Sequence, residues 1–336
     1  MTKHLYLLFI SIFLLAACSS DDDGNQSVQT SATAWVLATS HNGEVRKYDI
    51  NNATSSTFKL NSSDAEGIYY NPADNGFTVV SRIPGRLESY HNITDYANSV
   101  EVELDADILG NIHYQSGRDL AVQGDIYVVS DNTDLDLDET TPEGRLFIYV
   151  REENSFKLRN VVTTKFKLWG LEFIGNDLYA AVDETNKIAV YRDFAATYTT
   201  NVPATANKQV AFQGLLRTHG LDFDNGIMVL SDIGEAESAT DGGLHIIQNF
   251  EEKFNAAQNG FVALEEQFRI SGDNTLLGNP VNIVYNSAYN VIFVGEAANN
   301  GGKILAFNDA TSVSGNISPD LQYDMPGVSS VFFHTE

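Results

Sequence analysis

A pattern of about fifty residues recurs along this chain, and it limits the fold more than any other feature. Each copy has an apolar strand after a small or polar start, a turn, a second strand ending in Ser, Asp or Glu, and a third strand. Equivalent positions in the first strands are Gly67, Asp119, Gly170, Gly220 and Asn282, at spacings of 52, 51, 50 and 62 residues. Repeats of this length with several short strands are typical of β-propeller blades around a central channel.

The two ends of the chain supply one further blade. Residues 328–333 (VSSVFF) look like a first strand with no second strand after it, and residues 34–39 (AWVLAT) like a second strand with no first strand before it. Residues 44–49 add a third strand. We therefore expect an all-β fold, a six-bladed β-propeller over residues 34–336, closed by pairing of its N- and C-terminal strands. A β-sandwich would explain the alternating strands, but not their period. The helix-like segment 248–268 explains the longest interval as an insertion at a blade edge.

The N-terminus predicts a lipoprotein signal peptide. After Lys3, residues 5–17 are uncharged and mostly apolar. A helix of this length rises roughly 20 Å, short of the roughly 30 Å bilayer core, so we expect residues 1–17 to be a signal peptide. The sequence LAAC at residues 15–18 resembles the bacterial lipobox. That resemblance implies cleavage before Cys18 and several acyl chains on it, enough for stable membrane anchoring. An ordinary secretory signal with a chance cysteine is the alternative.

Residues 18–33 have a different composition. They are rich in Ser, Asp and Gln and predict a flexible acidic tether. The acidic stretch at 19–25 resembles the surface-export signal of Bacteroidota-type lipoproteins. That resemblance implies a lipid-anchored protein exposed on the cell outer membrane, although a solvated tether would have the same composition.

Charge and cysteine content exclude several classes of function. The 45 acidic and 20 basic residues give a formal charge of −25, which argues against a nucleic-acid partner because the phosphate backbone would be repelled. The single cysteine excludes an internal disulfide framework and a cysteine-based zinc site.

We expect a ligand site at one mouth of the channel, where first strands start and second strands end. These positions are mostly polar, although a fold alone does not assign a function. The candidate ligand-binding residues are Glu66, Arg82, Arg118, Asp131, Trp169, Asp183, His219, Asp232 and Glu296. The remaining strand ends at this mouth are His41, Val281 and Ser329. A tryptophan face with carboxylates suits a sugar, and the set also suits a cation or polar small molecule. Ordinary turn chemistry explains Ser-Asp at strand ends equally well, and Trp169 could simply pack in the channel.

A weaker candidate lies in the long loop after the second strand of one repeat. Asp134, Asp136 and Asp138 have the spacing of the first three ligands of a calcium loop. The pattern then departs, because Glu139 stands where glycine is usual and Arg145 where a bidentate Glu is usual. The loop is therefore a weak candidate for Ca²⁺ or another divalent metal. A solvated acidic loop explains the same residues, and chelator-sensitive melting would distinguish the two.

The strand pattern resembles six-bladed propellers of the NHL and SMP-30/gluconolactonase type. In the SMP-30 family, the Glu of an E-G-P motif, an Asn and an Asp bind a divalent metal for lactone hydrolysis. The EG at residues 66–67 matches the first motif, with Ile68 in place of Pro. The Asn and Asp positions fall on Trp169, His219 or Val281, depending on the alignment. The resemblance therefore leaves one acid and one histidine as metal ligands, and the family triad is not intact.

Two functions follow from these observations. The first is a lipid-anchored cell-envelope protein whose propeller mouth binds a glycan, a peptide or an envelope protein. The acidic surface and the lack of an intact catalytic motif favour this function. The second is a divalent-metal-dependent hydrolase of the lactonase type. The sequence leaves open whether the protein is an enzyme and favours a non-catalytic role.

Replacing Cys18 tests the predicted lipid anchor. In Cys18→Ser the acceptor for the acyl chains is lost, so the protein should move from the membrane to the soluble fraction, as measured by fractionation and immunoblotting. A variant that stays in the membrane fraction would show that the lipobox assignment is wrong.

Overall fold

The structure, a computed structural model, describes residues 33–135, 137–138, 140–235, 238–257 and 260–335. The predicted signal peptide, Cys18 and the tether up to residue 32 lie outside these residues and stay predictions. Within the described residues, no helix is both long enough and apolar enough to cross a membrane.

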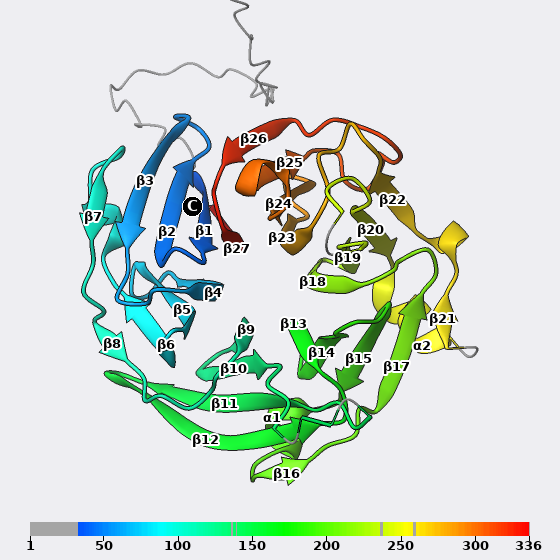
Figure 1. Cartoon of the computed structure of the whole chain (residues 1–336), viewed down its shortest axis with the longest axis horizontal. Coiled ribbons are helices and arrows are strands. Elements are labelled where there is room, and N and C mark those ends of the chain that lie inside the picture. The colour runs from blue at the N-terminus through cyan, green and yellow to red at the C-terminus, as the bar shows by residue number, and fades with distance from the viewer. Residues whose placement is uncertain (1–32, 136, 139, 236–237, 258–259, 336) are drawn as a thin grey trace, which may run out of the picture. The chain divides into compact units, whose positions relative to one another are not determined.

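Six sheets are arranged as blades around a central channel (Figure 1), which confirms the predicted all-β, six-bladed propeller. Blades 1 to 6 are β27-β1-β2-β3-β7, β4-β5-β6-β8, β9-β10-β11-β12-β16, β13-β14-β15-β17-β21, β18-β19-β20-β22 and β23-β24-β25-β26. The innermost strands are β27 (Val328–Thr335), β4 (Ala65–Asn71), β9 (Gly117–Gln123), β13 (Leu168–Ile174), β18 (Thr218–Asp224) and β23 (Pro280–Asn286). The second strands are β1 (Ala34–Ser40), β5 (Gly76–Arg82), β10 (Ile126–Asp131), β14 (Asp177–Val182), β19 (Ile227–Asp232) and β24 (Val291–Glu296).

The outer strands complete each sheet. The third strands are β2 (Glu44–Asp49), β6 (Gly85–Tyr90), β11 (Gly144–Glu152), β15 (Lys187–Tyr191), β20 (Gly243–Gln248) and β25 (Lys303–Phe307). The fourth strands are β3 (Thr54–Lys59), β8 (Ile108–Leu109), β12 (Ser155–Thr164), β17 (Lys208–Phe212), β22 (Phe268–Ser271) and β26 (Leu321–Asp324).

The ring closes within blade 1, as predicted. β27 pairs antiparallel with β1, in a register that runs from Ala34 opposite Thr335 to Ser40 opposite Val328. The hydroxyl of Ser329 then donates to the carbonyl of Ala65 at 2.6 Å, which links blade 1 to blade 2. The C-terminal strand therefore covers the inner edge of β1 and joins the first and second blades.

Apolar side chains fill the space between every two neighbouring blades, in six separate clusters. Because each blade packs between two others, its middle strands are buried on both faces. β1 is buried along its whole length. Between blades 1 and 2, for example, the rings of Trp35 and Tyr70 meet edge to face at 4.7 Å.

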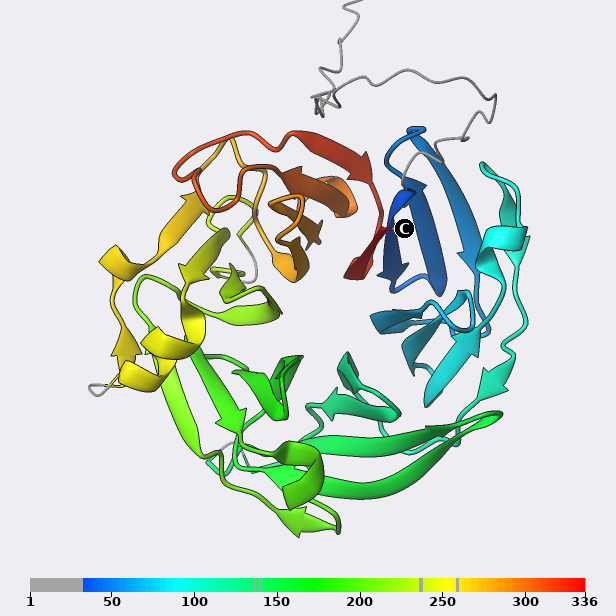
Figure 2. The ribbon, with the colours of Figure 1, turned by 180° about the vertical axis from the view of Figure 1, so that it is seen from behind.

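Three connections between third and fourth strands reach back to the preceding blade. Each adds a short parallel strand to that blade's outer edge: β7 (Glu101–Glu103), β16 (Val202–Pro203) and β21 (Phe261–Val262). These connections also carry η1 (Ile93–Asp95), α1 (Phe194–Thr197), α2 (Phe250–Ala256) and η2 (Leu264–Glu266), and η3 (Asn299–Gly301) lies between β24 and β25. Figure 2 shows α1 and α2 on the outer part of the ring.

The predicted insertion at 248–268 corresponds to one of these connections. Phe250 and Phe254 of α2 are fully buried, with ring centroids 5.4 and 5.3 Å from that of Tyr179 in blade 4. The segment therefore covers the outer edge where blades 4 and 5 meet, which agrees with an insertion at a blade edge.

The inner strands meet through either a glycine or a polar side chain at one repeated position. Asp119 accepts a hydrogen bond from the Leu171 N–H at 2.9 Å, and Asn282 accepts one from the Val331 N–H at 3.0 Å. These bonds satisfy N–H groups that an innermost edge strand cannot pair within its own sheet. At Gly170 the next strand comes so close that an added Cβ would lie 2.3 Å from the His219 carbonyl oxygen.

This contact predicts a large effect of adding one methyl group. Gly170→Ala would force blades 4 and 5 apart, and overpacking of this kind costs about 1–3 kcal/mol of unfolding free energy. Gly110→Ala is the matched control and should cost less, because its Cβ would be 3.1 Å from the nearest atom. Urea unfolding measures both, and equal stability of Gly170→Ala and wild type would contradict the proposed contact.

Candidate functional site

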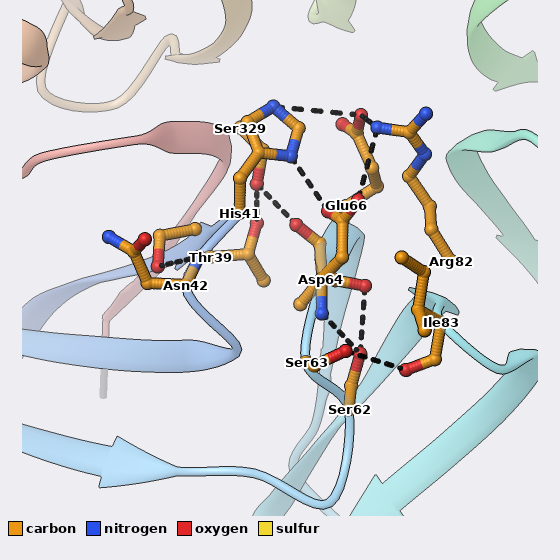
Figure 3. Close-up of polar contacts among 12 residues, drawn as sticks. Thr39, His41, Asn42, Ser62, Ser63, Asp64, Glu66, Arg82, Ile83 and Ser329 are labelled. Carbon is orange, nitrogen blue, oxygen red and sulfur yellow. Dashed lines mark hydrogen bonds and ion pairs between the residues drawn. The ribbon is translucent and has the colours of Figure 1, made fainter.

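The mouth begins with an ion-pair network between blades 1 and 2 (Figure 3). His41, in the turn after β1, lies 2.7 Å from Asp64 (Nδ1 to Oδ1). Arg82, at the end of β5, places Nη1 3.3 Å from Asp64 Oδ2 and 3.5 Å from Glu66 Oε1. The Asp64 hydrogen bond raises the pKa of His41 above its usual 6.5, so the imidazole carries more positive charge than a free histidine at neutral pH.

Glu66 is the buried carboxylate of this network. It is buried, and its Oε1 lies 3.5 Å from Nη1 of Arg118 and 4.0 Å from Nε2 of His41. Burial raises its pKa to about 7, against the opposing effect of His41, Arg118 and Arg82. The carboxyl group can therefore gain or lose a proton near neutral pH although two guanidinium groups lie beside it.

Trp169 connects this network to the next blades. The guanidinium carbon of Arg118, from the preceding blade, lies 4.2 Å from the centroid of the indole. The imidazole of His219, from the following blade, stacks on the same indole at 3.5 Å and 7°. Arg118 and His219 are thus the stacking partners of Trp169, and a sugar would have to displace one of them to stack there.

A third group of charged side chains lies on blades 4 and 5 and ends the row of contacts that begins at His41. His219 Nε2 lies 3.3 Å from Asp183 Oδ1, but the contact lacks the angles of a hydrogen bond. Burial lowers the pKa of His219 to about 4. Because this ring is then neutral at pH 7, Arg217, at 2.9 Å, is the cation that pairs with Asp183 there.

The structure thus joins six of the nine predicted ligand-binding residues. We call the joined set, with the three residues that complete it, the mouth cluster: His41, Asp64, Glu66, Arg82, Arg118, Trp169, Asp183, Arg217 and His219. Asp64 and Arg217 were not predicted. Each lies two residues before a predicted inner-strand residue, in the loop that leads into that strand.

The other three predicted carboxylates hold loops instead. Asp131 accepts hydrogen bonds from two backbone N–H groups of the loop before β9, at 2.8 and 2.9 Å. Asp232 does the same for the loop before β18, with two bonds of 3.1 Å, and Glu296 for the loop before β23, with bonds of 3.0 Å. These carboxylates fix the mouth loops, and whether they also contact a ligand stays a prediction.

The geometry of the described residues gives little support for the predicted calcium loop. Asp136 lies outside the described residues, Asp134 accepts the Leu137 N–H at 3.1 Å, and Asp138 accepts the Thr140 N–H at 2.9 Å. Across the part of the chain that the structure describes, no group of three or more His, Cys, Asp and Glu side chains is arranged to hold a metal ion. The calcium loop stays a prediction.

The lactonase-type metal centre does not fit the mouth. The expected ligand, Glu66, has the guanidinium groups of Arg82 and Arg118 within 3.5 Å. A divalent cation at this carboxylate would be repelled by both.

Exposed apolar side chains surround the mouth cluster on the same face. They lie in the turns between second and third strands and in the loops that precede inner strands. We call them the mouth rim: Ile83, Ile112, Leu135, Leu137 and Leu216.

Below the mouth, carboxylates from three consecutive inner strands line a channel cavity of about 190 Å³. Burial raises the pKa of Asp119 to about 6, of Asp222 to about 7, and of Glu172 well above its usual value. Two of them serve as acceptors between blades, because Asp119 binds the Leu171 N–H and Asp222 binds the Tyr285 N–H at 2.7 Å.

The neutral, buried His219 predicts a loss of stability in acid. Its pKa is 6.5 in the unfolded chain and about 4 in the fold, so only the unfolded chain takes up this proton as the pH falls from 6.5 to 4. The stabilisation is therefore complete above pH 6.5 and lost toward pH 4. Between pH 7 and 4.5, wild type should lose about 2 kcal/mol more unfolding free energy than His219→Asn, as measured in urea. Equal pH dependence of the two proteins would contradict this assignment.

Comparison with known proteins supports the fold. No protein-family model matches the chain, and no curated protein matches it in sequence. A crystal structure of a nidogen/laminin complex contains a chain with 11% identity and a TM-score of 0.56, covering 90% of this chain and 98% of that chain. The computationally designed Ika8 protein has 10% identity and a TM-score of 0.45, covering 88% and 86%. At these identities the likeness to the nidogen/laminin structure shows the propeller fold alone.

Proposed function

We propose that this protein is a non-catalytic interaction protein of the cell envelope, attached by lipid at Cys18, whose propeller mouth binds a partner protein. The observation that carries the proposal is the mouth cluster, a continuous series of contacting charged and aromatic side chains across blades 1 to 5. Arginine and tryptophan are enriched at the centres of protein interfaces, where they provide much of the binding energy.

The surroundings of the cluster favour a protein over a glycan. The mouth rim adds five exposed apolar side chains on the same face, and an apolar surface beside polar groups is typical of protein–protein interaction sites. The indole of Trp169, which would be the expected platform for a sugar ring, already stacks against Arg118 and His219. A glycan ligand would therefore have to disrupt existing contacts, whereas a protein surface could cover the cluster as it stands.

The solved structure with the same fold adds a general precedent. It is a nidogen/laminin complex, so a propeller of this architecture occurs in a protein–protein complex. The hydrolase alternative has less support, because the cations beside Glu66 oppose a metal there.

Site-directed photo-crosslinking on intact cells tests this proposal. A photoreactive amino acid at Ile112, on the mouth rim, should crosslink the full-length protein to a discrete partner. The matched control is Tyr289, which is also exposed but lies in the turn between β23 and β24, at the opposite end of the strands. Adding Trp169→Ala to the Ile112 probe should reduce the crosslinked product severalfold, because it removes the centre of the interface. Equal crosslinking from both positions, or none from Ile112, would argue against a binding face at the mouth.

A further inference from the structure

The two central arginines of the mouth cluster have donors that the protein leaves unused. The Nε–H groups of Arg82 and Arg118 are buried and have no hydrogen-bond partner. The contacts of these two guanidinium groups with carboxylates are 3.3 to 3.5 Å long, at or beyond the outer limit of good hydrogen-bond geometry. Among the described residues, four other arginines also have a buried Nε–H without a partner, so the long Nη contacts are the stronger sign that these two guanidinium groups can take a further acceptor.

His219 supplies a second, independent sign of an incomplete site. The side chain is 5% exposed, and its Nδ1 has no hydrogen-bond partner. It stacks on Trp169, whose other stacking partner is Arg118. Unsatisfied polar atoms therefore occur on both sides of this indole, at the centre of the mouth.

The local charge differs from that of the whole protein. The mouth cluster contains three arginines and three carboxylates, whereas the chain carries −25 overall. The side chains of Arg82, Arg118 and Arg217 are 23%, 16% and 26% exposed, so a ligand can reach them. The charges of the cluster therefore nearly balance, and an anionic group is repelled less here than by the protein as a whole. A singly charged group fits better than a phosphate dianion, because Asp64, Glu66 and Asp183 would repel it.

We propose that Arg82 and Arg118 form a carboxylate-binding subsite that receives an acidic side chain of a partner protein. The subsite rests on the proposed function, since it specifies the chemistry of the partner at the same mouth. A guanidinium group presents donors in a planar fork that matches a carboxylate, and such bonds are among the strongest that proteins make. The ligand carboxylate accepts from the Nη groups, whose present contacts with Asp64 and Glu66 are long.

Glu66 couples this binding to a proton. A carboxylate that enters beside Arg82 and Arg118 places a second negative charge next to Glu66, and protonation of Glu66 removes that repulsion. The groups that face Glu66 are His41, Asp64, Arg82 and Arg118. Its pKa of about 7 in the free protein makes the proton available in the neutral range. His41 loses its positive charge as the pH rises, and this loss also weakens the binding of a carboxylate.

Peptide binding to the purified full-length protein tests the subsite. The probes are a blocked hexaglutamate peptide and its hexaglutamine analogue, with trigalacturonate and inorganic phosphate as competing ligand classes, followed by calorimetry and tryptophan fluorescence. Hexaglutamate should bind at least tenfold more tightly than hexaglutamine. Arg118→Gln and Arg82→Gln should each weaken its binding about tenfold or more. Arg192→Gln removes an arginine paired with Asp177 outside the mouth and should change binding less than twofold.

The pH dependence of hexaglutamate binding separates a direct role of Glu66 from a structural one, because a purely structural role would not change it. Hexaglutamate affinity should fall as the pH rises from 6 to 8, and Glu66→Gln should remove most of that fall. Similar binding of both peptides, no effect of either arginine substitution in proteins that melt like wild type, or preference for trigalacturonate or phosphate would overturn the subsite. Absence of hexaglutamate binding together with mouth-specific crosslinking on cells would overturn the subsite alone and leave the proposed function standing.

Discussion

The hydrogen-bonded ladder between β1 and β27 is the contact on which the rest of this structure depends. It joins residues about three hundred positions apart, from Ala34 opposite Thr335 to Ser40 opposite Val328. Closing a ring in this way leaves no inner edge unpaired at the joint and holds every blade between two others. Because each blade buries both faces against its neighbours, the apolar cluster between blades 6 and 1 depends on this closure.

The mouth cluster is a direct result of the way in which equivalent inner strands lie side by side around the channel. Equivalent positions at the starts of the inner strands come together on neighbouring blades, so Arg118, Trp169 and His219 stack although about fifty residues separate each from the next. The short distance between inner strands makes this possible, and glycine permits it at Gly170. The same residues that bring the blades together therefore also bring the charges and rings of the mouth into contact.

The repeat allowed the fold to be predicted because its period and the incomplete terminal blade specify both the blade number and the closure. Some short strands at the outer edges of the blades were not predicted, for a physical reason. β8 and β16 have two residues each, too few to produce an alternating pattern. The mouth positions could be predicted because the topology places them there. Their roles could not, since Asp131 binds loop N–H groups and Arg145 of its own blade, whereas Asp183 pairs with Arg217 and lies beside His219 of the next blade. Loop conformation decides between these roles, and no residue pattern records it.

Hydrogen–deuterium exchange with hexaglutamate bound tests most directly the claim that binding occurs at this mouth. The account predicts slower exchange in the segments that lead into and out of the mouth cluster, 82–86, 112–118 and 215–219. Exchange in the turns at the other end of the strands, such as 123–126 and 286–291, should not change. Protection of those turns, or of the outer blade edges, without protection at the mouth would contradict the account.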